Sequence, residues 1–260
     1  MIQSIFAGMN EWYHYVLLIV VGFVVGIINT ISGGGSLLTL PILIFLGLPS
    51  NTANGTNRIA IFLQTIFSYA GFKSKGVTNK YSSFGWYLAV SATIGSLIGS
   101  KFAIDIRDEV FNKILAVVMI LIVGFMVIKP NKKLHELADK ITGKHLVWST
   151  IAFFFIGIYG GFIQAGTGIF ILLTLSSINH LTLVKSNVIK AMVMIIYTAA
   201  TLFMFGLNDK LNWSVGLTMA IGQAFGGWIS SRWSVNKGDG IVKIFLIIMV
   251  IFMAIKLWFF

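Results

Sequence analysis

The chain alternates long apolar stretches with short polar connections, and the lengths of the apolar stretches fit a lipid bilayer. They fall at about 13–47, 55–72, 82–102, 110–128, 146–178, 187–206, 213–231 and 241–259. A membrane-spanning helix needs about 20 apolar residues, so most of these stretches are long enough to cross once. Two of them, 13–47 and 146–178, are longer, and each is interrupted in its middle. The pattern predicts an all-α polytopic membrane protein.

The first interruption is a run of three glycines, Gly33, Gly34 and Gly35, within GIINTISGGGSLLTLP. A glycine inside a helix costs about 1 kcal/mol relative to alanine, and lipid cannot hydrogen-bond the backbone groups that a break frees. A break at membrane depth is therefore expected only where it packs in protein or lines a cavity, which marks a candidate binding site. The alternative is that the glycines only let two helices pack closely.

The second half of the chain repeats landmarks of the first half in the same order. GIINTISGGGS matches GIYGGFIQAGTG, Asn54 and Asn57 match Asn187 and Lys190, and IGSLIGS after Trp86 matches IGQAFGG after Trp213. The segments 1–128 and 146–260 are therefore expected to be homologous transmembrane repeats, joined by a basic linker at 129–145. Each repeat holds a broken first segment followed by three spans.

The lysines and arginines bear on how the broken segments cross the membrane. If each crosses once, the 19 basic residues divide almost evenly between the two sides. If each is a hairpin of a span and a short return helix, thirteen lie on the linker side, which the positive-inside rule favours with the linker cytoplasmic. Return helices are then expected at about 36–46 and 168–177. The repeats would be inverted, and both termini would lie outside.

Composition agrees with a membrane class. The chain is 57% hydrophobic and 10% charged, with too little polar surface for a soluble globule. The net charge of +11 is carried mainly by short loops between apolar spans, which indicates orientation in a bilayer and not nucleic-acid binding. Cysteine is absent and the four histidines have no metal-ligand spacing, so neither a metal nor a cofactor is expected.

These motifs resemble the TauE/SafE sulfite exporter family, also called TSUP. The resemblance rests on ISGGGSLLTLP followed by N-x-x-N-R, and on GGFIQAGTG followed by N-x-x-K, and it covers essentially the whole chain. It implies a prokaryotic inner-membrane permease for sulfite, sulfonates or related sulfur-containing anions. The second half has Gln164, Ala165 and Gly166 where the first half has three glycines, so the two breaks are not chemically equivalent.

Two cations are the leading candidates for binding such an anion. Arg58 and Lys190 are expected near the starts of helices 55–72 and 187–206, where the positive end of the helix dipole adds to their charge. The arginine fork suits an oxyanion, whereas lysine acts as a point charge. The alternative is that both cations are positive-inside signals that snorkel to the interface.

Further candidate ligands lie beside these cations and at the breaks. They are Asn54, Asn57, Asn187, Ser36, Gly33, Gly34, Gly35, Gln164, Gly166 and Thr167. Ser36 and Thr167 are expected to begin the return helices and to present hydroxyl and backbone N–H groups. Asn54 and Asn187 have an alternative role as helix N-caps.

The acidic residues bear on what drives transport. All eight are expected in loops or at the ends of spans, so the spans contain no carboxylate for a proton relay. An anion leaving an inside-negative cell needs none, because each charge gains about 2.3 kcal/mol per 100 mV. We therefore expect a permease that exports sulfite or an organosulfonate by alternating access, driven by the membrane potential or by proton coupling.

Three other functions stay open on the sequence. They are a carrier of another small anion such as a carboxylate, an anion channel, and an intramembrane enzyme that acts on a lipid or thiol. The enzyme is disfavoured because no Ser-His-Asp, Cys-His or metal-ligand constellation falls within the spans. The expected partners are the small anion and the lipid bilayer, and the sequence does not separate a monomer from a homodimer.

Overall fold

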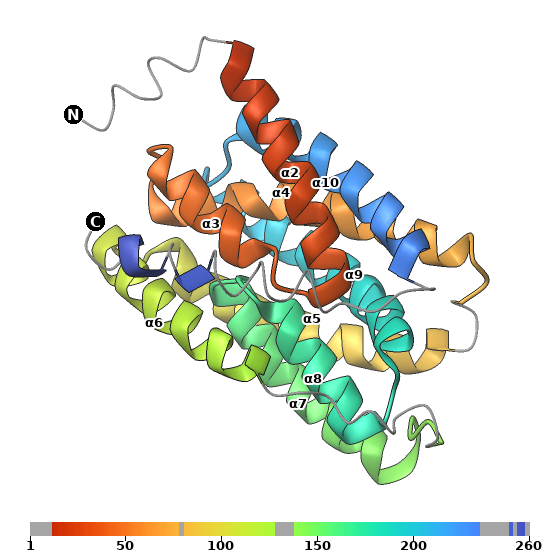
Figure 1. Ribbon diagram of the computed structural model, residues 1–260. Coiled ribbons are helices and arrows are strands. Elements are labelled where there is room, and N and C mark those ends of the chain that lie inside the picture. Colours follow the sequence, from red (N-terminus) through yellow and green to blue (C-terminus); the bar gives the residue numbers. More distant parts are fainter. Residues whose placement is uncertain (1–11, 78–80, 128–137, 235–249, 252–253, 258–260) are drawn as a thin grey trace.

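The computed structural model describes residues 12–77, 81–127, 138–234, 250–251 and 254–257 (Figure 1). Every regular element in that part of the chain is a helix. The helices are α2 (Trp12–Ser32), α3 (Ser36–Phe45), α4 (Ser50–Lys73), α5 (Ser82–Ile104), α6 (Asp108–Val127), α7 (Gly143–Phe162), α8 (Thr167–Asn179), α9 (Leu183–Leu207) and α10 (Trp213–Ser234). Among them, α2, α5, α7 and α9 are long and apolar enough to cross a membrane. Most of the stretch at 241–259 and most of the linker lie outside the described residues.

Both predicted breaks are present. The first leaves α2 after Ser32, passes Gly33 with φ of +77°, and enters α3 at Ser36. The second leaves α7 after Phe162 and enters α8 at Thr167. The prediction that Ser36 and Thr167 begin the two return helices is therefore confirmed.

Each broken segment turns back on itself, so it is a hairpin and not one interrupted span. Helix α10 runs parallel to both α2 and α4. Gly22 of α2 lies against Met219 of α10, and residue numbers increase in the same direction along both helices. Along α4 and α10, Ile59 lies against Gly216 and Ser68 against Gly227. Helices α2 and α4 therefore run in the same direction, and α3 must lead the chain back between them. In Figure 1, α3 turns away from the end of α2, and α8 returns along α7.

Glycine seams hold the long helices together. Gly22 and Gly26 of α2 lie against backbone atoms of Met219 and Gln223 on α10, and Gly222 and Gly226 lie against Ile19 and Phe23. The same arrangement joins Gly95 and Gly99 of α5 to Phe154 and Ile158 of α7, and Gly157 and Gly161 to Ala92 and Ser96. The small-residue spacing in IGSLIGS and IGQAFGG thus serves close helix packing.

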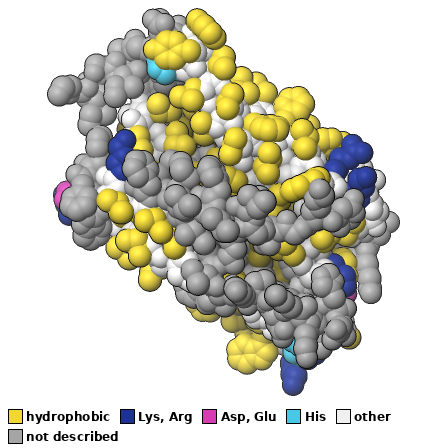
Figure 2. Space-filling view, viewed as in Figure 1, with side chains coloured by type: hydrophobic (Ala, Val, Ile, Leu, Met, Phe, Trp, Pro, Cys, Tyr) yellow, Lys and Arg dark blue, Asp and Glu magenta, His cyan; other side chains and the backbone are white. Residues whose placement is uncertain are grey.

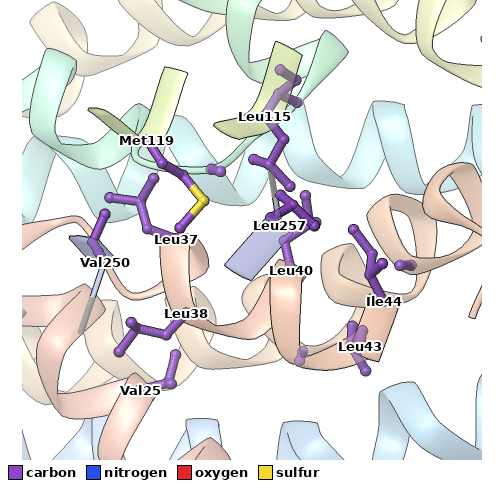
Figure 3. Packing of buried hydrophobic residues seen from close by; sticks show 14 of the residues in the cluster. Val25, Leu37, Leu38, Leu40, Leu43, Ile44, Leu115, Met119, Val250 and Leu257 are labelled. Carbon is purple, nitrogen blue, oxygen red and sulfur yellow. The ribbon is translucent and has the colours of Figure 1, made fainter. Parts of the chain in front are cut away.

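The short helix α3 is enclosed by protein. Leu37, Leu40 and Leu43 have no exposed surface, and their cluster includes Leu115 and Met119 of α6 (Figure 3). Part of the cover comes from the end of the chain, where Val250, Ala254 and Leu257 belong to the same cluster. A helix of 10 residues is too short to cross a bilayer, and this packing keeps the break away from lipid.

The outer surface has the composition that a bilayer requires. Phe102, Phe155 and Phe203 expose 66%, 63% and 67% of their surface. Figure 2 shows apolar side chains spread over this face of the molecule, with the described lysines and arginines at its margins. The chain is a multi-pass membrane protein.

Candidate substrate site at the crossing of the two breaks

The two breaks meet inside the protein. Ser36 Oγ donates a hydrogen bond to Gln164 O at 3.2 Å and accepts one from Gly166 N at 3.1 Å. Gly33 lies against Gly168 so closely that a Cβ atom at Gly168 would be 2.6 Å from Gly33 Cα. Segments about 130 residues apart in sequence therefore form one crossing, which brings Ser36, Gly33, Gln164 and Gly166 together.

Arg58 lies beside this crossing and is fully buried. Its Nη1 donates to Thr201 Oγ1 at 2.9 Å, and its Nη2 donates to Gly161 O at 2.6 Å and to Asn54 Oδ1 at 3.3 Å. The guanidinium carbon lies 4.5 Å from the centre of the Phe205 ring, within cation–π distance. We call this group the Arg58 centre. The side chains and carbonyl that receive its hydrogen bonds are neutral.

Lys190 forms a matching centre with the other half of the chain. Its side chain is buried, and Nζ donates to Asn29 O at 2.8 Å, Thr30 O at 2.9 Å and Asn187 Oδ1 at 2.6 Å. Asn187 Nδ2 donates to Ile31 O at 3.2 Å. We call this group the Lys190 centre. It ties α9 to the last turn of α2.

The positions of the two cations correct one expectation. Helix α4 begins at Ser50 and α9 at Leu183, with Pro49 and Thr182 as their N-caps, so Arg58 and Lys190 lie about two turns inside their helices. Their partners are carbonyls at the C-terminal ends of α7 and α2, the negative ends of those helix dipoles. The expected role at a helix N-terminus is therefore wrong. The expectation failed because the first turns of α4 and α9 contain polar residues, so the apolar pattern placed both helix starts too late.

The N-cap role of the asparagines is wrong for the same reason. Asn54 Nδ2 donates to Phe162 O at 2.7 Å, across to the end of α7, as Asn187 does to the end of α2. Each Asn–cation pair thus fastens a helix of its own half to the broken helix of the other half. The interfacial alternative for the two cations does not fit their burial.

The remaining candidates surround the crossing. Asn57 Oδ1 accepts a hydrogen bond from Thr39 at 2.7 Å, and Thr167 donates to Gln164 O at 2.9 Å. Gly34 and Gly35 supply the carbonyls that accept the N–H groups of Leu37 and Leu38 in the first turn of α3. These glycines shape the start of the return helix.

Among the predicted ligand residues, three have a polar atom that is buried without a hydrogen-bond partner among the described residues. These atoms are Asn57 Nδ2, Arg58 Nε and Gln164 Oε1. A buried polar atom left unsatisfied costs about 1–3 kcal/mol, and such atoms in native proteins usually meet water or a ligand. Two of the three are donors on α4, one beside the other in sequence. Side chains adjacent in sequence do not face each other on a helix, so each of them is a separate donor for an anion.

Sequence reasoning missed the polar side chains that complete the two centres. Gln64 donates to Thr30 Oγ1 and Ser68 Oγ and accepts from Asn29 Nδ2, while Thr201 and Thr198 serve Arg58 and Gln164 on the other side. A signal existed, because the offset of 133 that relates Asn54 to Asn187 also relates Ser68 to Thr201. Gln64 links α4 to α2.

A small cavity adjoins the Lys190 centre. Its volume is about 10 Å³, and it is lined by Asn29, Thr30, Gln64, Thr65, Ser68, Phe72, Asn187, Lys190, Ala191 and Met194. That is room for about one water molecule. A sulfur oxyanion does not fit this space, so anion binding requires the site to open.

One ionic cluster lies apart from the site. Asp139, at the end of the linker, accepts hydrogen bonds at 2.8 Å from Tyr81 and from Lys185. Burial and the hydrogen bond to Asp139 raise the pKa of Tyr81. No group of three or more His, Asp or Glu side chains able to hold a metal occurs in the described part of the chain.

Gln164 holds a backbone conformation that favours glycine. Its φ is +63°, and the equivalent residue of the first break is Gly33, with φ of +77°. We expect Gln164→Gly to be more stable than Gln164→Ala by about 1 kcal/mol, because a Cβ atom is unfavourable at positive φ and both variants lose the amide. Thermal unfolding in detergent measures the difference. At the neighbouring position, which does not have a positive φ, Ala165→Gly should lower the stability. A Gln164→Ala variant as stable as Gln164→Gly would contradict the argument.

Comparisons with known proteins agree with this architecture. The family model described as sulfite exporter TauE/SafE matches residues 18–257. A probable membrane transporter protein, ORF9, of Sinorhizobium sp is 29% identical over 251 residues, covering 92% of this chain and 90% of that protein. A probable membrane transporter protein of Haemophilus influenzae is 26% identical over 241 residues, covering 93% of each. YfcA of Escherichia coli, also a probable membrane transporter protein, is 26% identical over 242 residues, covering 93% of this chain and 88% of that protein. No solved structure matches.

Proposed function

The chain belongs to the TauE/SafE sulfite exporter family of membrane transporters, and on that premise we propose that it exports a small sulfur-containing anion, sulfite or an organosulfonate, by alternating access. It is a transporter and not an enzyme. The observation that carries the proposal is the crossing of the two breaks, with a buried cation on each side of it.

The anion is proposed to bind at this crossing, with Arg58 as its main ligand. Arg58 Nε and Asn57 Nδ2 are donors that the protein leaves unused. A hydrogen bond from a guanidinium to an oxyanion is also an ion pair, and the planar fork can meet two oxygens of the anion at once. An arriving oxyanion therefore competes well with Gly161 O for Arg58. Ser36, Thr167 and the glycines of the breaks would shape the rest of the pocket.

The packing of α4 against α9 supports an inverted-repeat transporter. Arg58, early in α4, contacts Thr201 late in α9, whereas Gln64 and Ser68 share a cavity with Lys190, early in α9. The two helices are counterparts in the repeat, and they run antiparallel. In an inverted repeat, counterpart helices must run in opposite directions.

The two centres also suggest how access alternates. Arg58 ties α4 to the end of α7, and Lys190 ties α9 to the end of α2. Because α4 and α9 are antiparallel, the two ties lie toward opposite ends of the helix pair. Loosening one tie while the other holds would open the crossing to one side of the membrane at a time.

Flux measurements in proteoliposomes test the proposal. Uptake or release of radiolabelled sulfite and of a short-chain sulfonate is measured at several imposed potassium diffusion potentials, with acetate as the carboxylate comparison. We expect saturable sulfite or sulfonate flux that responds to the potential or to a pH gradient. Preference for acetate would support a carboxylate carrier, and flux that rises linearly with concentration, with single-channel currents, would support an anion channel.

A further inference from the structure

The Lys190 centre has the composition of a cation site. All three donors of the ammonium group are used, and each meets a neutral oxygen: two backbone carbonyls of α2 and the amide oxygen of Asn187. Broken helices in transporters commonly bind coupling ions through the carbonyls at a half-helix C-terminus. Here the last turn of α2 supplies those carbonyls, and a lysine of the other half fills the position.

A second observation also points to a cation. Asn29 Oδ1 is buried beside Lys190 and accepts no hydrogen bond from any described residue, and Ser32 Oγ is likewise without a partner. On the Arg58 side, the unused atoms on α4 are donors, Arg58 Nε and Asn57 Nδ2. The Asn29 side therefore keeps a spare acceptor for a cation, whereas the Arg58 side keeps two spare donors on α4 together with the spare acceptor Gln164 Oε1.

The surroundings of Lys190 contain no fixed counter-charge. Apart from Lys190 itself, the side chains that line the cavity come from α2, α4 and α9 and are neutral. Helix α3 has no charged residue, and the charged residue of α10, Arg232, is exposed at the end of that helix. The other buried titratable side chains of α4 and α9 are Arg58 and Tyr197. Tyr197 belongs to the opposite side, where its hydroxyl lies near Gly160 and Thr167. The charge at this centre is therefore set by the proton on Lys190 itself.

We infer that Lys190 is the coupling group of the transporter, and that it carries one proton together with each transported anion. This inference rests on the proposed transport of an anion through the crossing. Arginine keeps its proton under all ordinary conditions, so Arg58 serves as the permanent anion ligand. An amine can lose its proton, so Lys190 can be charged while the anion is bound and neutral while the empty carrier returns.

The coupling step balances in protons and charge. The ammonium group gives one proton to water on the side where the anion leaves, and the neutral amine takes one back from water on the side where the next anion binds. A neutral amine keeps two N–H donors and gains a lone pair, so it no longer satisfies all three oxygens around it. One contact becomes a repulsion between lone pairs, which loosens α2 from α9. A monovalent anion then crosses without net charge, whereas divalent sulfite still carries one negative charge and still responds to the potential.

The test measures proton movement and anion movement in the same proteoliposomes. Anion flux is followed with a radiolabelled short-chain sulfonate, which carries no proton of its own, and the internal pH with a trapped fluorescent indicator, for wild type, Lys190→Arg and the control Lys185→Arg. We expect wild type and Lys185→Arg to move protons with the sulfonate in a fixed ratio. Lys190→Arg keeps the charge and the donors but not the exchangeable proton, so it should retain sulfonate/sulfonate exchange while its sulfonate-linked pH change falls to background.

The outcomes separate this inference from the function on which it rests. Saturable wild-type sulfonate flux without a pH change would overturn the coupling role and leave the transport proposal standing, even if Lys190→Arg fails to fold. Sulfonate-linked proton movement that persists in Lys190→Arg would overturn it as well. Absence of sulfite and sulfonate flux in the wild type would reject the proposed function, and the coupling role with it.

Discussion

Replacing Arg58 by glutamine is expected to lower sulfite flux at subsaturating concentration by about 10- to 100-fold, because one hydrogen bond to a charged group contributes about 1.5–3 kcal/mol. Arg58→Lys should recover only part of this loss, since lysine keeps the charge but not the planar fork that reaches Thr201 and Gly161 together. The measurement is the concentration dependence of flux, with the sulfite-induced shift in melting temperature as a binding readout.

Stability distinguishes a binding role of Arg58 from a structural one. The glutamine variant leaves Gly161 O and Thr201 short of a donor, but it also removes a buried charge whose hydrogen-bond partners include no carboxylate. The two effects offset each other, so we expect a small change in melting temperature without sulfite and loss of the sulfite-induced shift. Arg232→Gln makes the same chemical change at an exposed site and should alter neither. A variant that melts far lower yet still binds sulfite would make Arg58 a structural tie alone.

The fold could be predicted in outline because the bilayer restricts it. Apolar stretches of spanning length, two glycine-rich breaks and a repeat of landmarks were enough to predict α2 to α10 and the hairpins at Ser36 and Thr167. Lipid cannot hydrogen-bond a free backbone, so a break in an apolar stretch nearly requires protein around it. The packing of α3 against α6 meets that requirement.

The site could be predicted less completely, because its bonds join distant segments. The sequence indicated Arg58 and Lys190 as the charged groups, but it placed them at helix N-termini when they bind the C-terminal carbonyls of α7 and α2. Hydropathy located α4 by its apolar part and missed its polar first turn from Ser50. Asn57 stays a candidate ligand through its spare donor Nδ2.

The two centres differ in a way that sequence symmetry concealed. Lys190 is the counterpart of Asn57 in the repeat, not of Arg58, so duplication did not simply place two equivalent cations. Each half instead forms a similar contact, in which a cation binds the end of the broken helix of the other half. The two cations occupy adjacent positions of the repeat and not equivalent ones. This difference leaves one centre with a permanent charge and the other with a proton that can be exchanged.

Gly168→Ala is expected to have a large effect on both stability and flux, because its Cβ would lie 2.6 Å from both Gly33 Cα and Gly33 O. These are backbone atoms of the first break, so no side-chain rotation relieves the contact. Overpacking of this kind costs about 1–3 kcal/mol, and relief requires the two breaks to separate. Separation would also lengthen the hydrogen bonds of Ser36 to Gln164 and Gly166. We therefore expect a lower melting temperature and loss of saturable sulfite flux.

Gly124→Ala is the matched control for this substitution. Gly124 is also a helical glycine, on α6, and a Cβ atom there would have nothing within 4 Å. Alanine is favoured over glycine in a helix by about 1 kcal/mol, so this variant should be as stable as wild type or slightly more stable, with normal flux. The same propensity acts at Gly168, so a lower stability there reports the contact between the breaks and not the helix. If both alanine variants behave alike, the breaks do not need to touch, and the shared site at their crossing loses its basis.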